Sequence, residues 1–388
     1  MRVVVAANAL KECVSAGRAC EAIASGCERA GAETTRMPLA DGGDGSGEIL
    51  HGAVGGEWRS VDVHGPTGRI VPARYVWNER TRTALIEMAR ASGLALLTDD
   101  EKDPMQTSTT GVGELLLDAA SLSPESIIVC VGGSATNDGG AGMAHALGYR
   151  FVGDNGEDVT PTGGALRNVR ECVAPVDRSA IDAIRRANVT VAVDTDATLV
   201  GPRGATAMFA RQKGAKQGDV EALERGLGRL ASIWKGSAEF GHADLLQVAG
   251  AGAAGGLAAG LMAYCGGRLR GGFELIASHV GLDDAVRRAD LVITAEGMVD
   301  CTAGKVPWEV ARVCAGHNVP CAMLTGSLPP GPVLARLERA ATAGVFSIAP
   351  GPISLQESKE RAEALLSTTA AQVVRCFRSG MNRRSALP

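Results

Sequence analysis

The chain has 388 residues, of which 45% are hydrophobic and 21% are charged, and this balance excludes an intrinsically disordered protein. The formal net charge is -4, from 39 basic and 43 acidic residues without a long run of either sign, so we expect no nucleic-acid or membrane partner. Glycine is abundant, at 51 residues, while aromatic residues make up only 3%. This composition favours a loop-rich α/β enzyme that acts on a small molecule.

The N-terminal segment predicts a strand–helix–strand unit. Residues 2–7 form a valine-rich run, residues 14–29 have helical spacing, and residues 34–39 are apolar again before a glycine-rich turn. This order is typical of the start of a parallel sheet. The first ten residues lack the basic and apolar regions of a secretory signal, so we expect a cytoplasmic protein.

The ten cysteines show no CxxC pair and no grouping with histidine that suits a metal. In a reducing compartment such cysteines behave as small buried hydrophobic residues. Cys13, Cys20 and Cys27 recur every seven residues, so we expect them to share the core face of the first helix.

The middle of the chain predicts a change of sheet type. Residues 60–77 alternate between apolar and polar side chains around a turn at 64–68, which indicates an antiparallel hairpin. The later elements that we expect are strands at 83–88, 126–131, 189–193, 291–294, 321–324 and 345–348, and a helix at 111–120.

The two ends of the chain resemble each other more than they resemble the middle. We therefore predict a two-domain α/β fold, in which a second α/β domain is inserted into a discontinuous Rossmann-like domain. The Rossmann-like domain is expected over residues 1–60 and 284–380, and the inserted domain over residues 61–283. The uncharged stretch 249–267 is expected to be a tight internal turn, and residues 381–388 a frayed tail.

The segment Gly132-Gly133-Ser134-Ala135-Thr136-Asn137-Asp138-Gly139-Gly140 follows a predicted buried strand and precedes a helical pattern. Such a turn can direct several backbone N–H groups and the positive end of a helix at an anion. We therefore interpret it as a candidate cradle for phosphate or carboxylate. The alternative is structural, with Asn137 and Asp138 capping the helix and Ser134 completing the turn.

Two further glycine-rich segments are candidate anion sites. Asp41 and the glycines that follow it lie after the second predicted strand, although a simple turn would also explain them. Gly250, Gly252, Gly255 and Gly256 precede a helix, and close packing through small residues is the alternative there.

Acidic and basic side chains follow several predicted strands. Asp194 and Asp196 would lie on one face if their strand continued, and paired carboxylates suit Mg²⁺ or general-base catalysis, although both could be exposed loop acids. Lys213 could neutralise a phosphate or be solvated. The remaining candidates of this kind are Glu296, Asp300 and Lys305. Anion cradles, carboxylates and lysines together favour phosphoryl transfer, and thus a small-molecule kinase.

These segments resemble the bacterial glycerate kinases of the type 2 group. The similar blocks are GGSATNDGGAGMAHALG at 132–148, GAGAAGG at 250–256, ADGGDG at 40–45, EMARASGL at 87–94 and QKGA at 212–215. The resemblance implies a two-domain enzyme that phosphorylates D-glycerate to 2-phosphoglycerate with ATP and Mg²⁺, and a homodimer is possible. It implies catalytic roles for Asp194, Lys11 and Lys213 and metal binding by Asp194, Glu296 and Asp300. The substrate or phosphate-binding residues that it implies are Asp41, Gly132, Gly133, Ser134, Asn137, Asp138, Gly250, Gly252, Gly255, Gly256 and Lys305.

The chain departs from the family pattern at a few positions. Asn8 and Ala9 stand where the family has an acid and a hydroxyl, Met298 stands where it has arginine, and the loop at 301–304 is about two residues short. Two alternatives to a D-glycerate kinase follow. One is a kinase of the same family redirected to a different small hydroxy acid in a specialised pathway, and the other is a non-catalytic ligand-binding homologue.

Overall fold

The computed structural model describes residues 1–10, 13–43, 45–299, 301 and 304–384, and its α/β architecture confirms the predicted fold class. Contacts divide the chain into two compact units. Unit 1 comprises Met1–Asp41, Glu48–Ala53 and Phe273–Pro388, and unit 2 comprises Gly42–Gly47 and Val54–Gly272. The predicted domain limits at 60/61 and 283/284 stay predictions.

Unit 1 contains a five-stranded sheet in the order β13-β12-β11-β1-β2, and all its neighbouring strands are parallel. Its strands are β1 (Arg2–Val5), β2 (Glu33–Arg36), β11 (Leu291–Met298), β12 (Cys321–Ser327) and β13 (Gly344–Ser347). The chain runs from β1 to β2 on one side and from β11 to β13 on the other. The strand order therefore reverses between β1 and β11, the kind of place where open α/β sheets bind ligands.

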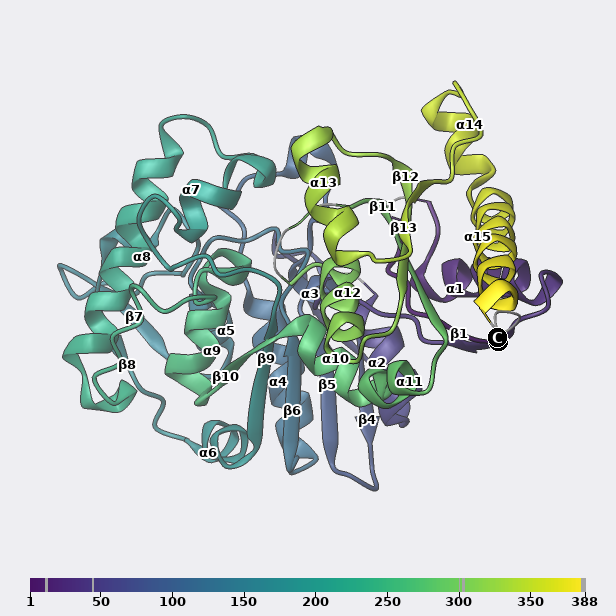
Figure 1. The fold of residues 1–388 in the computed structure, drawn as a ribbon. Coiled ribbons are helices and arrows are strands. Elements are labelled where there is room, and N and C mark those ends of the chain that lie inside the picture. Colours follow the sequence, from purple (N-terminus) through teal and green to yellow (C-terminus); the bar gives the residue numbers. More distant parts are fainter. Residues whose placement is uncertain (11–12, 44, 300, 302–303, 385–388) are drawn as a thin grey trace. The chain divides into compact units, whose positions relative to one another are not determined.

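Helices cover the unit 1 sheet because its central strands β1, β11 and β12 are apolar on both faces. These helices are α1 (Ala16–Arg29), α11 (Leu282–Arg287), α12 (Val306–Gly316), α13 (Gly331–Ala340), α14 (Leu355–Glu360) and α15 (Ala362–Arg384). Val5 and Ile293 pack in one core with Ile23 of α1 and Leu366 of α15. Figure 1 shows α1 and α15 side by side, and α12 packs against β11 and β12.

Two expectations for unit 1 need correction. Cys20 and Cys27 are buried in α1 as predicted, but Cys13 is exposed, because Ser15 caps the helix and α1 begins only at Ala16. The segment 381–388 is expected to fray, yet α15 continues to Arg384, and residues 385–388 lie outside the described residues. The earlier turns of α15 pack against α1, so the helix is already established when the polar segment begins.

Unit 2 contains a six-stranded sheet in the order β10-β9-β6-β5-β4-β3 and a separate β7-β8 pair. Its strands are β3 (Glu57–His64), β4 (Ile70–Asn78), β5 (Thr83–Glu87), β6 (Ser126–Cys130), β7 (Arg150–Gly153), β8 (Val169–Val173), β9 (Asn188–Val193) and β10 (Arg268–Gly271). The predicted hairpin is confirmed, since β3 and β4 pair antiparallel with Val61 opposite Ala73. Strands β5, β6, β9 and β10 run parallel, so their carboxyl ends share one edge.

The helices of unit 2 are α3 (Ala89–Ser92), α4 (Thr110–Ser121), α5 (Ala141–Ala146), α6 (Ser179–Arg186), α7 (Ala205–Phe209), α8 (Asp219–Gly236) and α9 (Leu257–Cys265). Two more helices, α2 (Ser46–Val54) and α10 (Gly272–Val280), include residues of both units. The core of unit 2 contains several aromatic side chains, among them Tyr75, Tyr149, Trp234 and Tyr264.

The expected tight turn at 249–267 is wrong for its second half. Leu257–Cys265 forms helix α9, and nearly all of its side chains are buried. Alanine and leucine are strong helix formers, and a helix that is buried on all sides shows no amphipathic period in the sequence. Among the described residues, we find no helix whose length and hydropathy would let it cross a bilayer.

The contact between α1 and α15 yields a stability prediction. A Cβ atom at Gly26 would lie 2.0 Å from the carbonyl oxygen of Ser367, whereas one at Gly17 would meet nothing within 4 Å. We expect Gly26→Ala to destabilise the protein by about 1–3 kcal/mol through overpacking, despite the better helix propensity of alanine. Gly17→Ala is the matched control and should leave the denaturation midpoint unchanged or higher. Equal effects of the two substitutions in urea unfolding would contradict this packing.

Candidate active site

A small polar cavity lies in unit 2, beyond the carboxyl ends of β6 and β9. Its volume is about 120 Å³. We call it the unit 2 cavity, and its predicted lining residues are Gly132, Gly133, Ser134, Asp194 and Lys213. The structure therefore brings together five of the candidate residues that the sequence places in three separate segments.

The loop after β6 packs backbone against backbone. A Cβ atom at Gly132 would lie 2.3 Å from the Cα atom of Gly43, and Gly133 has a φ of +75°, so both positions favour glycine. The loop is also fixed by Ala135, whose N–H donates to the carbonyl oxygen of Ser92 at 2.9 Å. The Ser134 side chain is thereby held at the cavity.

The second half of the loop after β6 fits the alternative in which Asn137 and Asp138 stabilise the fold and do not bind a ligand. Asp138 is fully buried, and its carboxylate accepts hydrogen bonds from the backbone N–H and hydroxyl of Thr109 and from the N–H groups of Gly140 and Gly142. Burial raises the pKa of Asp138, while these hydrogen bonds act in the opposite direction. Asn137 donates to the Thr206 hydroxyl at 3.1 Å. Neither Asn137 nor Asp138 lines the unit 2 cavity.

Lys213 is the most deeply buried charged side chain at this cavity, with 2% of its surface exposed. It ends a short 3₁₀ helix, Arg211–Lys213, and its Nζ donates to Ser134 Oγ at 2.6 Å and to the Thr136 carbonyl oxygen at 2.7 Å. Burial lowers the pKa of Lys213 to about 7. An anion in the cavity would favour the charged form of Lys213 and so raise this pKa.

Asp194 follows β9 directly and lines the unit 2 cavity. Asp196 does not accompany it. The strand ends at Val193, so the alternation that would place both acids on one face does not continue. Asp196 is instead exposed and forms an ion pair with Arg203, as the loop alternative predicts.

The glycines of segment 250–256 support the loop after β6 and do not line the unit 2 cavity. A Cβ atom at Gly255 would lie 2.1 Å from the Thr136 carbonyl oxygen, and one at Gly252 would lie 2.0 Å from the Thr198 carbonyl oxygen. Gly250 and Gly256 have φ values of +85° and +87°. Close backbone approach therefore accounts for Gly252 and Gly255 and a positive φ for Gly250 and Gly256, and anion binding by these four glycines stays a prediction.

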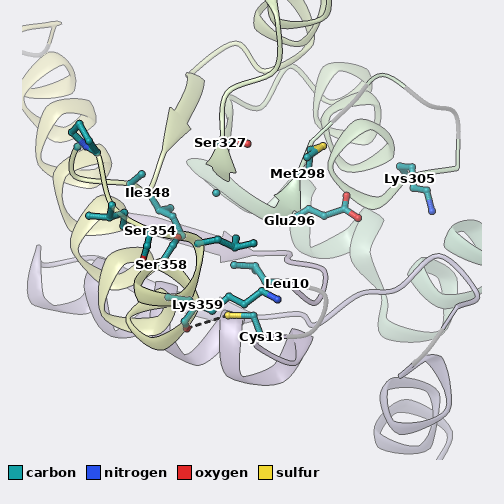
Figure 2. Close-up of a pocket in the computed structure, with 18 residues that line it drawn as sticks. Leu10, Cys13, Glu296, Met298, Lys305, Ser327, Ile348, Ser354, Ser358 and Lys359 are labelled. Carbon is teal, nitrogen blue, oxygen red and sulfur yellow. Dashed lines mark hydrogen bonds between the residues drawn. The ribbon is translucent and has the colours of Figure 1, made fainter. Parts of the chain in front are cut away.

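A larger cavity of about 680 Å³ lies in unit 1, beyond the carboxyl ends of β11 and β12, and we call it the unit 1 cavity (Figure 2). Glu296 and Lys305 line it. Glu296 is buried and accepts a hydrogen bond from Asn8 Nδ2 at 3.2 Å, while Lys305 Nζ lies 2.7 Å from Asp41 Oδ2. The structure thus pairs two predicted phosphate-site residues, Asp41 and Lys305.

Lys11 and Asp300 lie outside the described residues. Within the described part of the chain, no three histidine, cysteine, aspartate or glutamate side chains form a group that could hold a metal ion. Some residues that line the cavities are not among those that the sequence predicts, such as Thr195 and Phe209 in unit 2 and Ile348 in unit 1. Thr195 and Ile348 lie just after strands and Phe209 lies near Lys213 in the sequence, and these positions could have been used to predict them.

Comparison with known proteins identifies the family of the chain. The model of the Glycerate kinase family matches residues 3–378. A glycerate kinase of Halalkalibacterium halodurans is 39% identical over 376 residues, 96% of this chain and 97% of the relative. A glycerate 2-kinase of Escherichia coli is 38% identical over 333 residues, 84% and 86% of the two chains.

The fold agrees as well. The crystal structure of a candidate glycerate kinase 2 from Salmonella typhimurium LT2 superposes with a TM-score of 0.81 at 36% identity, covering 98% of this chain and 99% of the other. A family match over nearly the whole sequence, together with relatives of this similarity, indicates a small-molecule kinase. The chain belongs to the glycerate kinase family.

Proposed function

We propose that the protein phosphorylates D-glycerate with ATP and forms 2-phosphoglycerate and ADP. The observation that carries this proposal is the unit 2 cavity, where Asp194, Ser134 and the buried Lys213 line a space of about 120 Å³. Such a small polar space suits a three-carbon hydroxy acid. The name of the Escherichia coli relative, glycerate 2-kinase, supports the 2-position as the acceptor.

Lys213 would bind the carboxylate or the transferring phosphoryl group. Its Nζ is fixed by Ser134 and Thr136, so little conformational entropy is lost when an anion arrives. A buried ammonium interacts more strongly with an anion than a solvated one does, because the local dielectric is low. The ammonium of Lys213 would therefore neutralise the negative charge of the carboxylate or of the transferring phosphoryl group.

Asp194 would orient the 2-hydroxyl of D-glycerate and accept its proton. The hydroxyl oxygen forms a bond to the γ-phosphorus of ATP, the bond from that phosphorus to the β–γ bridging oxygen breaks, and ADP leaves with the released electron pair. Phosphoryl transfer depends mostly on positioning and charge neutralisation, so one well-placed carboxylate is sufficient on the acceptor side.

Magnesium would accompany the nucleotide. Mg²⁺ in kinases is usually held by one or two carboxylates together with substrate phosphates, and Asp194 and Glu296 have the hard oxygen ligands that it prefers. When bound, Mg²⁺ neutralises charge on the phosphate oxygens. Asp194 in unit 2 and Glu296 in unit 1 therefore each stay a predicted ligand within their own unit, and Asp300 stays a prediction as well.

A second candidate is the same reaction on a different small hydroxy acid. It is favoured by Met298, which is 72% exposed and lines the unit 1 cavity where the family resemblance leads us to expect arginine. A thioether cannot form the paired hydrogen bonds with a carboxylate or a phosphate that a guanidinium forms, so this chain would hold one of its anionic substrates differently. A higher kcat/KM for a glycerate analogue than for D-glycerate would favour this candidate.

Two broader expectations also remain proposals. We propose that the reaction takes place in the cytoplasm, where ATP is supplied. A homodimer stays a prediction, which the mass in solution by light scattering would test.

The role of Asp194 gives a direct test of the proposed reaction. The wild-type protein should convert D-glycerate and ATP to 2-phosphoglycerate, identified by its ³¹P spectrum. Asp194→Asn should lower kcat by about 10²–10⁴-fold, the usual contribution of a positioned general base.

The matched control is Asp196→Asn, which removes an exposed carboxylate two residues away. It should keep kcat within about twofold, as expected of a screened surface ion pair. Formation of 3-phosphoglycerate alone would refute the assigned product, and full activity of Asp194→Asn would refute the assigned base.

The lowered pKa of Lys213 predicts how substrate affinity depends on pH. Above pH 7 the lysine of the free protein is neutral, so binding the glycerate anion requires a proton to be taken up. The KM for D-glycerate should therefore rise above about pH 7, by up to about tenfold per pH unit.

Two variants test whether the charge of Lys213, and not another titrating group, causes the rise of KM with pH. Lys213→Met should raise this KM by about tenfold or more already at neutral pH and remove its rise with pH, since a charged hydrogen bond contributes about 1.5–3 kcal/mol. Lys213→Arg should stay charged and also flatten the profile. The same pH-dependent rise in Lys213→Met would show that another group titrates.

A further inference from the structure

The unit 1 cavity lies at the place where the order of its sheet reverses. Leu10 follows β1, while Glu296 and Gly297 belong to the end of β11, and all three line the cavity. Strands β1 and β11 are neighbours whose connections leave in opposite directions. Ligands of open α/β sheets bind in such crevices, outside the carboxyl ends of the strands.

The lining is mainly apolar, with a few polar groups among the apolar ones. Leu10, Ile348 and Ile353 contribute aliphatic surface, and the hydroxyl-bearing residues Ser327 and Ser354 also line the cavity. In Figure 2, Leu10, Ile348 and the two serines surround the same space. This combination, in a volume of about 680 Å³, is typical of a site for a flat organic ligand and not for a small free anion.

Two large hydrophobic side chains at the cavity are exposed to an unusual degree. Met298 is 72% exposed and Leu355 is 73% exposed, and both line the cavity. Exposed apolar groups gathered at a concave site indicate that a ligand covers them. An aromatic base would do so without needing a charged partner.

Charged side chains also line the cavity, namely Lys305, Lys359 and Glu296. The ammonium of Lys305 is held by Asp41 at 2.7 Å. The apolar part of the cavity and this lysine match the two parts of a nucleotide, an uncharged base with its sugar and a charged phosphate chain. D-glycerate has no apolar part that could use this lining.

We propose that the unit 1 cavity binds the adenosine part of the nucleotide. This assignment rests on the proposed kinase reaction, and it places the nucleoside site and the candidate glycerate site in different units. Leu10, Ile348 and Leu355 contact the base and sugar, and Lys305 contacts the phosphates.

The exposed thiol of Cys13 allows this site to be tested without measuring activity. Cys13 lines the cavity, and its Sγ donates to the carbonyl oxygen of Lys359 at 3.2 Å. Cys376 is also exposed but lies outside this cavity, so it serves as an internal control. Alkylation of both thiols by N-ethylmaleimide would be followed by peptide mass spectrometry in the full-length protein.

We expect saturating ADP, and also adenosine, to slow alkylation of Cys13 by about tenfold, since a reagent reaches only the small unliganded fraction. Cys376 should react at an unchanged rate, and D-glycerate or inorganic phosphate should protect neither thiol. Unchanged Cys13 alkylation while calorimetry shows bound ADP would overturn the proposal. Protection by inorganic phosphate equal to that by ADP would overturn it as well.

A substitution gives the second test. Leu355 is the first residue of α14 and is largely exposed, so Leu355→Asp adds an acid where a helix tolerates it well. The Kd of ADP should rise about tenfold or more, equivalent to at least about 1.4 kcal/mol, while the KM for D-glycerate stays unchanged. Val176→Asp, at a fully exposed position in unit 2, is the matched control and should change neither constant.

The two proposals fail in different ways. If ADP protects Cys13 but the protein phosphorylates no glycerate, the nucleoside site is supported and the proposed function is refuted. If the protein phosphorylates D-glycerate while Leu355→Asp binds ADP as tightly as the wild type, the proposed function is supported and the nucleoside site is refuted.

Discussion

The contact between Lys213 and the loop after β6 holds the candidate glycerate site together. A lysine ammonium is costly to bury unless hydrogen-bond partners replace its water. Ser134 Oγ and the Thr136 carbonyl oxygen supply two such partners, at 2.6 and 2.7 Å. The same contact that fixes the ammonium therefore also fixes the loop, and the lowered pKa of Lys213 is the electrostatic consequence of its burial.

The glycines around this contact are best understood through backbone packing. Gly132 and Gly255 leave no space for a Cβ atom, because backbone atoms of Gly43 and Thr136 lie where it would be. Asp138 holds the far end of the loop by accepting hydrogen bonds from Thr109 and two glycine N–H groups. Most of the glycine-rich sequence thus positions a few polar groups, and Gly132, Gly133, Ser134 and Ala254 are the members of these two segments that line the cavity among the described residues.

The sequence was sufficient to predict most of the strands, including the hairpin, because hydrophobic periodicity depends on local sequence, but it did not predict β7, β8 or β10. It also singled out Asp194 and Lys213, which line the unit 2 cavity, and their roles stay predictions. It was less informative where an outcome depends on distant packing. The helix at Leu257–Cys265 is buried on all sides, so its pattern has no helical period. Asp194 lines the unit 2 cavity and Asp196 does not, because β9 ends at Val193. The boundaries of strands and helices are the feature that a sequence predicts least well. The apolar lining of the unit 1 cavity was missed because residues such as Ile348 resemble ordinary core residues in the sequence.

The central claim is that an anion in the unit 2 cavity restores the positive charge of Lys213. Titration calorimetry of D-glycerate at about pH 8, in buffers of different ionisation enthalpy, measures the protons taken up on binding. We predict an uptake approaching one proton in the wild-type protein and none in Lys213→Arg, which is already charged. A binding heat that does not depend on the buffer in the wild-type protein would contradict the account.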